Sequence, residues 1–164
     1  MIEEQTREID LYETLVVRKA EAEYPETAAI RTIHGVGPLT ALAFVLVLNN
    51  DRSRFQRSRD VGCYIGLRPK QRESGRHSPQ LGITKAGDSL LRRLGTQSAQ
   101  YILGPFGKDS ALIAGLSLAL RGGKNAKQRA VIAVARKLVI LMHRIWITQE
   151  VYEPLRGVAV KSAA

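Results

Sequence analysis

Residues 33–41 read Ile33-His34-Gly35-Val36-Gly37-Pro38-Leu39-Thr40-Ala41, and they separate two short apolar segments. Two glycines in three positions allow a sharp turn, and Pro38 suits a first helical turn because its missing N–H has no intrahelical partner there. The stretch predicts a helix-hairpin-helix over residues 26–48, in which the two glycines leave the N–H groups at the start of the second helix open to a phosphate. An ordinary tight turn between helices is the alternative, and in either case we expect His34 to be a turn residue.

The chain on both sides of this turn also has helical periodicity. We expect helices over residues 2–23, 26–33, 38–48, 55–65, 84–102, 110–120 and 125–148, with Thr84 and Asn125 as N-caps. Residues 66–83 have no sustained period, which predicts a long basic loop or an irregular hairpin. The predicted fold class is mainly α, with a coiled-coil-like helix at 1–24, a compact helical domain at 25–156 and a flexible tail at 157–164.

The first helix has apolar residues at the a and d positions of a heptad, namely Ile2, Ile9, Tyr12 and Val16. Gln5 and Lys19 interrupt this seam, so an isolated stable coiled coil is not expected. The seam indicates a partner helix, either upstream in the chain or in another molecule, which makes a homo-oligomer the expected state. The alternative is that the helix folds back onto its own domain.

Charge divides the chain into two parts. Of its 164 residues, 25 are Lys or Arg and 15 are Asp or Glu, giving a net charge of +10. Residues 1–30 contain eight of the acids and three of the bases, whereas residues 52–93 contain eleven bases. A charge run is often only a solvated face, but this one surrounds a loop rich in Gly, Pro and Ser, which favours contact with the phosphates of a nucleic acid.

Several classes of site are not expected from the composition. Cys63 is a lone cysteine and the three histidines are scattered, so neither a disulfide nor a zinc site is predicted. The acidic start MIEEQTREID does not resemble a signal peptide, and charges interrupt the most apolar stretch, residues 130–147. We therefore expect no membrane role and a cytoplasmic protein. His143 and Trp146 are expected to be packing residues.

A second motif is the loop LRPKQRESGRH at residues 67–77, which contains Ser74 beside a glycine and among arginines. A serine that attacks phosphorus needs access and nearby positive charge, and this loop supplies both. From composition alone, however, a polar turn is more common than a nucleophile, and no Ser/His/Asp set follows from the nearby His77. A third motif, RGGK at residues 121–124, lacks the spacing of a nucleotide P-loop and indicates either a phosphate contact at a helix start or a capped surface loop.

Five segments, taken in order, resemble the C-terminal domain of Piv/MooV-type insertion-sequence transposases. They are IHGVGPLTALAF, RFQRSRDVGCYIGLRPKQRESG, LGITKAGDSLLRRL, GPFGKDSAL and RGGKNAKQRAVIAVARKLVILMHRIW. The resemblance covers roughly residues 20–156. Better-studied members of that family are guided by a bridge RNA, and a RuvC-like nuclease domain with four metal-binding acids precedes their coiled coil. The family's serine aligns with Ser74, which the resemblance implies would attack a DNA phosphodiester and form a covalent phosphoserine intermediate.

The resemblance also sets the expected limits of activity. The chain begins in the part that resembles the coiled coil, so we expect the RuvC-like domain and its divalent metal to be absent from this sequence, no metal ligands in the chain, and little strand cleavage by it alone. The resemblance implies DNA and a guide RNA as partners, and it implies a nucleoid-associated protein of a bacterium or archaeon. The catalytic candidate is Ser74, with Ser78 as the next choice, and the DNA-binding candidates are Gly35, Gly37, Arg68, Lys70, Arg72, Arg76, Lys85, Arg92, Arg93 and Lys124.

Two other functions fit the same sequence. One is a non-enzymatic nucleic-acid-binding module, either a remnant of a transposase or a regulator of the full-length enzyme. The other is a structural RNA-binding protein of ribosomal type, which the positive charge also allows.

Overall fold

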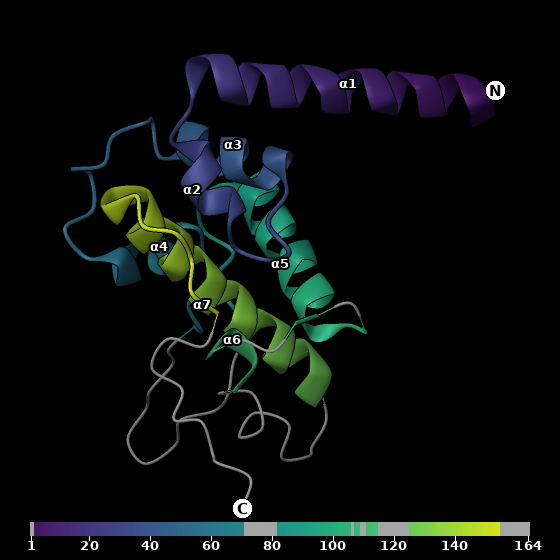
Figure 1. Cartoon of the computed structure of the whole chain (residues 1–164). Coiled ribbons are helices and arrows are strands. Elements are labelled where there is room, and N and C mark those ends of the chain that lie inside the picture. Colours follow the sequence, from purple (N-terminus) through teal and green to yellow (C-terminus); the bar gives the residue numbers. More distant parts are fainter. Residues whose placement is uncertain (1, 71–81, 106, 109–110, 115–124, 155–164) are drawn as a thin grey trace, which may run out of the picture.

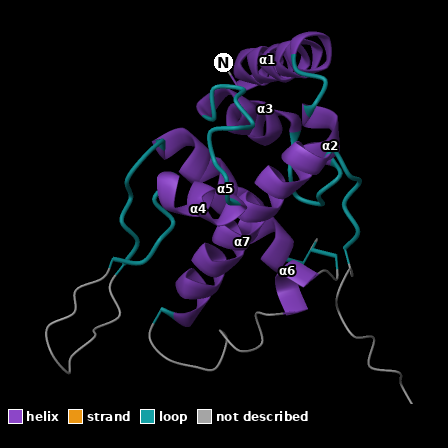
Figure 2. Cartoon of the chain, turned by 90° about the vertical axis from the view of Figure 1, so that its left-hand side faces the viewer, coloured by secondary structure: helices purple, strands orange, loops and turns teal. Residues whose placement is uncertain are grey.

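A computed structural model describes residues 2–70, 82–105, 107–108, 111–114 and 125–154. Within these ranges the chain is helical and has a single isolated β-bridge, so the mainly α fold class is confirmed (Figure 2). None of the described helices is long and apolar enough to cross a membrane. The helices are α1 (Ile2–Glu23), α2 (Thr27–Arg31), α3 (Pro38–Val47), α4 (Ser58–Tyr64), α5 (Ser89–Leu103), α6 (Ala111–Ala114) and α7 (Ala126–Thr148).

Helix α7 forms the centre of the domain, with α4 and α5 packed against it (Figure 1). Its buried side chains recur at a spacing of four residues through Ala130, Val134, Leu138 and Met142, which places them on one stripe of the helix. Helix α3 is apolar around most of its circumference and contributes Phe44, whose ring meets Trp146 edge to face at 6.0 Å. The core therefore joins residues that are about a hundred positions apart in the sequence.

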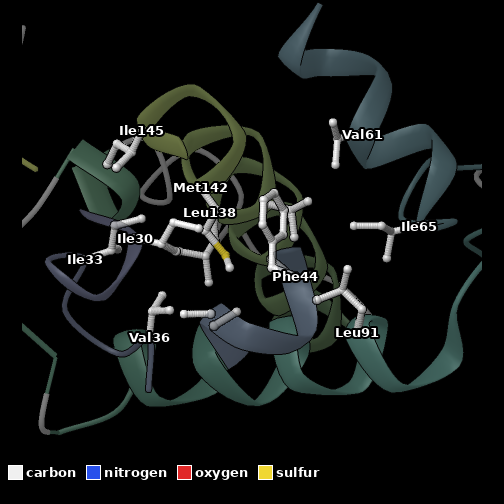
Figure 3. Close-up of a cluster of buried hydrophobic side chains, with 14 of the residues drawn as sticks. Ile30, Ile33, Val36, Phe44, Val61, Ile65, Leu91, Leu138, Met142 and Ile145 are labelled. Atoms are coloured by element: carbon white, nitrogen blue, oxygen red, sulfur yellow. The ribbon is translucent and has the colours of Figure 1, made fainter. Parts of the chain in front are cut away.

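Side chains from all the larger elements except α1 meet in this core (Figure 3). Ile30 and Ile33 come from α2 and the turn after it, and Val61 and Ile65 come from α4 and its end. Trp146 and His143 are both fully buried, which confirms the prediction that they are packing residues. His143 Nδ1 lies 3.0 Å from Ser58 Oγ, while its Nε2 has no partner in the described part of the chain.

Helix α1 extends away from the domain (Figure 1). Only its C-terminal end packs against the body, where Ala20 is buried and contacts run to α2 and α3. The predicted seam is uncovered along most of its length, because Ile2, Ile9 and Tyr12 are 80%, 58% and 66% exposed. The helix thus folds back onto its own domain only at its C-terminal end, and the partner helix for its first four turns stays a prediction.

Several predicted helix boundaries are wrong. Helix α5 begins at Ser89 and not at Thr84, because residues 84–87 are drawn into contacts with residues 64–68 and Gly87 has a left-handed φ of +75°. Asp88 is the N-cap, and its Oδ1 accepts a hydrogen bond from the Leu91 N–H at 2.7 Å.

The other boundary errors have similar causes. Helix α4 begins at Ser58 and not at residue 55, because Arg57 is extended and Phe55 packs against the core. Asn125 stands at the N-cap position of α7, but its φ is +67° and its side chain makes no capping hydrogen bond. Of the helix predicted over residues 110–120, residues 111–114 are helical, and residues 115–120 lie outside the described part. The predicted tail, residues 157–164, also lies outside it.

Candidate nucleic-acid interface

The turn between α2 and α3 is built on Gly35. Its φ of +90° lies in the region that favours glycine, and a Cβ there would lie 2.8 Å from Ile102 Cγ1 on α5. Ile33 and Val36 on either side are buried, and the Val36 N–H donates to the Ile33 carbonyl at 3.1 Å. Gly35 therefore holds the turn tightly against α5. The His34 ring lies 5.5 Å from that of Tyr101, also on α5, as expected of a turn residue.

Gly37 has a different environment. It is the N-cap of α3, with φ −85° and ψ 172°, which is extended backbone that any residue adopts. It is exposed, and a Cβ built on it would have no atom within 4 Å. The fold therefore does not require glycine at this position. What the glycine does provide is free access to the start of α3, beside the exposed Leu39.

The two ends of the predicted basic loop are paired. Pro69 and Ile83 form an antiparallel bridge, the Lys70 N–H donates to the Gly82 carbonyl, and the Thr84 N–H donates to the Arg68 carbonyl, both at 2.9 Å. We call residues 68–70 and 82–85 the hairpin base. This pairing confirms the irregular-hairpin interpretation and brings Arg68 and Lys70 close to Lys85, and all three residues are exposed. Five predicted site residues fall outside the described part of the chain: Arg72, Ser74, Arg76, Ser78 and Lys124.

Close backbone packing fixes the hairpin base to α4. Gly66 and Gly87 both have left-handed φ, +79° and +75°. A Cβ on Gly66 would collide with the backbone of Ala86, and one on Gly87 would collide with the Tyr64 carbonyl oxygen. The Lys85 N–H also donates to the Gly66 carbonyl at 3.1 Å. The cations of the hairpin base therefore stand on a backbone that packs closely against the end of α4.

Arg92 has a structural contact that the sequence did not reveal. Its Nη1 donates to the carbonyl oxygens of Ile65 and Ala86, each at 3.0 Å, and so bridges the end of α4 and the segment before α5. This arginine is half-buried, whereas the neighbouring Arg93 is exposed. A DNA contact by Arg92 would have to use its remaining N–H groups.

An open cavity of about 500 Å³ lies beside the hairpin base, lined in part by Ile83, Leu90, Arg93 and Gln97. Sequence periodicity gave no signal for this cavity, because the cavity depends on how α5 meets the second arm of the hairpin base.

The exposed cations of this region have no acidic partner among the described residues. Lys70, Lys85 and Arg93 form no ion pair with any carboxylate in the described part of the chain. Nor do the described residues contain a group of three or more His, Cys, Asp or Glu side chains that could hold a metal ion.

The profile of the transposase IS116/IS110/IS902 family matches residues 27–109, which contain the turn at Gly35, the hairpin base and α5. The chain belongs to this transposase family. It is 35% identical over 123 residues to the transposase for insertion sequence element IS1111A from Coxiella burnetii, a match that covers 75% of this chain and 33% of the relative. It is also 42% identical over 79 residues to the transposase for insertion sequence element IS1328 from Yersinia enterocolitica, covering 48% and 23%.

A probable family 20 transposase from Pseudomonas aeruginosa is 30% identical over 103 residues, covering 57% of this chain and 30% of that protein. The chain thus spans about a third or less of the length of these transposases. Membership in the transposase family confirms the coarse part of the sequence-based resemblance.

Proposed function

We propose that the chain is the part of a Piv/MooV-type transposase that contacts DNA and supplies the serine nucleophile for strand cleavage and transfer. The observation that carries this proposal is the hairpin base, a closely packed and positively charged pair of segments at the two ends of the loop that contains Ser74. Family membership supports the DNA substrate, because the named relatives are transposases of insertion sequences.

The proposed chemistry is a phosphoryl transfer. The Ser74 Oγ would attack a backbone phosphorus of DNA, forming a P–Oγ bond while a bond from phosphorus to a sugar oxygen breaks. The hydroxyl proton of Ser74 would leave to a base, and the released sugar oxygen would take up a proton. Negative charge develops on the equatorial oxygens, and the cations Arg68, Lys70 and Lys85 would stabilise it. Any divalent metal would belong to the RuvC-like domain that the resemblance implies for the complete transposase.

Two further partners follow from the same resemblance. One is a guide RNA, which would select the target sequence. The other is a second copy of the transposase, joined through the uncovered seam of α1, where Ile2, Ile9 and Tyr12 are exposed.

DNA binding tests the proposal. The double variant Lys70→Gln/Lys85→Gln removes two exposed cations of the hairpin base that have no described ion-pair partner. The matched control is Arg7→Gln/Arg18→Gln, which removes the same charge from exposed positions on α1. Affinity for a labelled DNA duplex is measured by fluorescence anisotropy at several salt concentrations.

We expect the hairpin-base variant to bind more weakly than the control. Its plot of log affinity against log salt should be shallower by about 0.9 for each phosphate that the variant no longer neutralises. A flat salt response of the parent chain, or equal binding by the two variants, would contradict the proposal and leave a non-DNA function of the domain as the better account.

A further inference from the structure

A second group of cations lies outside the hairpin base. We define the arginine loop as residues 49–59, which run from the end of α3 into the first turn of α4. It contains four arginines and no lysine, and all four are exposed: Arg52, Arg54, Arg57 and Arg59. None forms an ion pair with a carboxylate in the described part of the chain. A group of arginines without acidic partners is a candidate anion-binding surface.

The acids closest in sequence offset only half of the positive charge of this surface. The Asp51 carboxylate accepts hydrogen bonds from the Ser53 hydroxyl at 2.6 Å and from the Ser53 N–H at 2.9 Å. These bonds lower the pKa of Asp51, so it stays ionised while it fixes the turn. Asp60, in the first turn of α4, is the next acid, and with Asp51 it leaves a surplus of two positive charges over residues 51–60.

Aromatic rings hold two of the arginines in place. The Arg54 guanidinium carbon lies 4.7 Å from the centre of the Tyr64 ring, and its Nη2 donates to the Tyr64 hydroxyl at 3.2 Å. Arg52 lies 5.8 Å from the centre of the Trp146 ring, which belongs to the core. Positioned in this way, a guanidinium loses less side-chain entropy when an anion binds, and its remaining N–H groups are still able to donate.

The loop backbone is itself fixed. Asn49 and Asn50 both have left-handed φ, +61° and +49°, and end α3 with a sharp change of direction. Phe55 then packs against the core, with ring centres 5.3 Å from Tyr64 and 6.0 Å from His143. The arginine loop is thus an anchored arrangement of cations rather than a run of charge on a free segment.

We infer that the arginine loop binds the phosphodiester backbone of a nucleic acid as a second contact surface, distinct from the hairpin base. Guanidinium groups bind phosphate oxygens in pairs of hydrogen bonds, and the neighbouring exposed Gln56 adds a neutral donor on the same loop. The two surfaces are linked through α4, because Arg54 stacks on Tyr64 and the Tyr64 carbonyl lies against Gly87. The inference relies on the proposed function only in taking a polynucleotide as the partner.

The test removes the two arginines for which the structure gives no aromatic contact. Arg57→Gln/Arg59→Gln in the full chain is compared with the control Arg7→Gln/Arg18→Gln, which has the same change of charge. Thermal melts establish that each variant is folded. Binding is then measured by anisotropy against a DNA duplex and, separately, against a single-stranded RNA of the same length, at several salt concentrations.

Weaker binding than the control supports the inference, provided that the salt slope also becomes shallower. The slope of log affinity against log salt should decrease in magnitude by about 0.9 for each phosphate of duplex DNA that the variant no longer neutralises, or by about 0.7 for each phosphate of a single strand. A decrease confined to one of the two polymers identifies which backbone the loop contacts. If the parent binds nucleic acid and this variant binds as the control does, the inference fails while the proposed function stands. If the parent binds neither polymer, both fail.

Discussion

Gly35 and Gly37 are two positions apart, but the fold requires only the first. Gly35 has φ +90° and lies against Ile102, whereas Gly37 has φ −85° and faces open space. We expect Gly35→Ala to lower the free energy of unfolding by about 1–3 kcal/mol, the usual cost of a side chain in left-handed backbone at a crowded position. Gly37→Val should leave that free energy nearly unchanged.

The same two variants separate folding from binding. If phosphate approaches the start of α3, the valine side chain of Gly37→Val should block it and weaken DNA binding in a well-folded protein. Urea denaturation followed by circular dichroism, run beside a DNA titration, measures both effects. Full affinity in Gly37→Val would mean that this turn has a structural role only.

His143 gives the domain a predictable response to acid. Burial lowers the pKa of this imidazole below its ordinary value, because charging it inside the core is unfavourable. In the unfolded chain the histidine titrates near its ordinary pKa of about 6.5, so below that pH the unfolded state binds the proton more readily than the folded state does. The stability contributed by neutral His143 should therefore be complete above about pH 7 and decline as the pH falls through 6.5.

Urea denaturation at several pH values between 8 and 5 checks this behaviour. In His143→Gln the decline below pH 7 should be smaller, whatever the stability of the variant at pH 8, because the titrating group is gone. The same pH dependence in both proteins would show that other groups control acid unfolding.

At the scale of elements, Arg92 links α4 to α5 beside the hairpin base. Its Nη1 joins the carbonyls of Ile65 and Ala86, so it connects the end of α4 to the segment that leads into α5. Arg92→Gln should lower the free energy of unfolding by about 1–3 kcal/mol, because these acceptors lose a charged donor. The neighbouring Arg93→Gln, at an exposed position, should have little effect. Equal urea midpoints for the two variants would contradict the bridging role.

The elements also show what the sequence predicts and what it does not. Periodicity predicted α1, α3 and α7 nearly to the residue, since each has apolar residues at helical spacing and no glycine or proline beyond its first residue. The predicted start of α5 was wrong, because Thr84 looks like a helix N-cap in the sequence but is paired with another segment in the fold. Its N–H donates to the Arg68 carbonyl, a contact that exists only in the folded chain. The start of α4 was misplaced for a similar reason, since Phe55 gains more by packing into the core than by continuing the helix.

For the candidate site, charge density around residues 52–93 predicted the basic region but not its arrangement. Arg92 looks in the sequence like any other cation of that run, and only the distances to two carbonyls show its bridging contact. Similarly, the aromatic contacts of Arg52 and Arg54 depend on Trp146 and Tyr64, which approach them only after folding.

At the scale of the whole molecule, charge is separated between an acidic helix and a basic domain. The acids of α1 lie on a helix that extends away from the body, while the hairpin base and the arginine loop belong to the domain (Figure 1). This separation keeps the acids on the first half of α1, from Glu3 to Glu13, away from the body, and it leaves the apolar seam of α1 available to another helix. The proposed division of roles is thus assembly by α1 and phosphate contact by the domain.

The central claim of this account is that Ser74 attacks DNA, and covalent attachment of protein to DNA measures it most directly. The chain is fused behind, or mixed with, a complete relative that supplies the RuvC-like domain, with divalent metal, guide RNA and end-labelled DNA present. A denaturing gel then reports labelled DNA that migrates with the protein. We expect an adduct with the parent and with Ser78→Ala but none with Ser74→Ala, because no other group replaces the attacking oxygen. An adduct that persists in Ser74→Ala would contradict the claim.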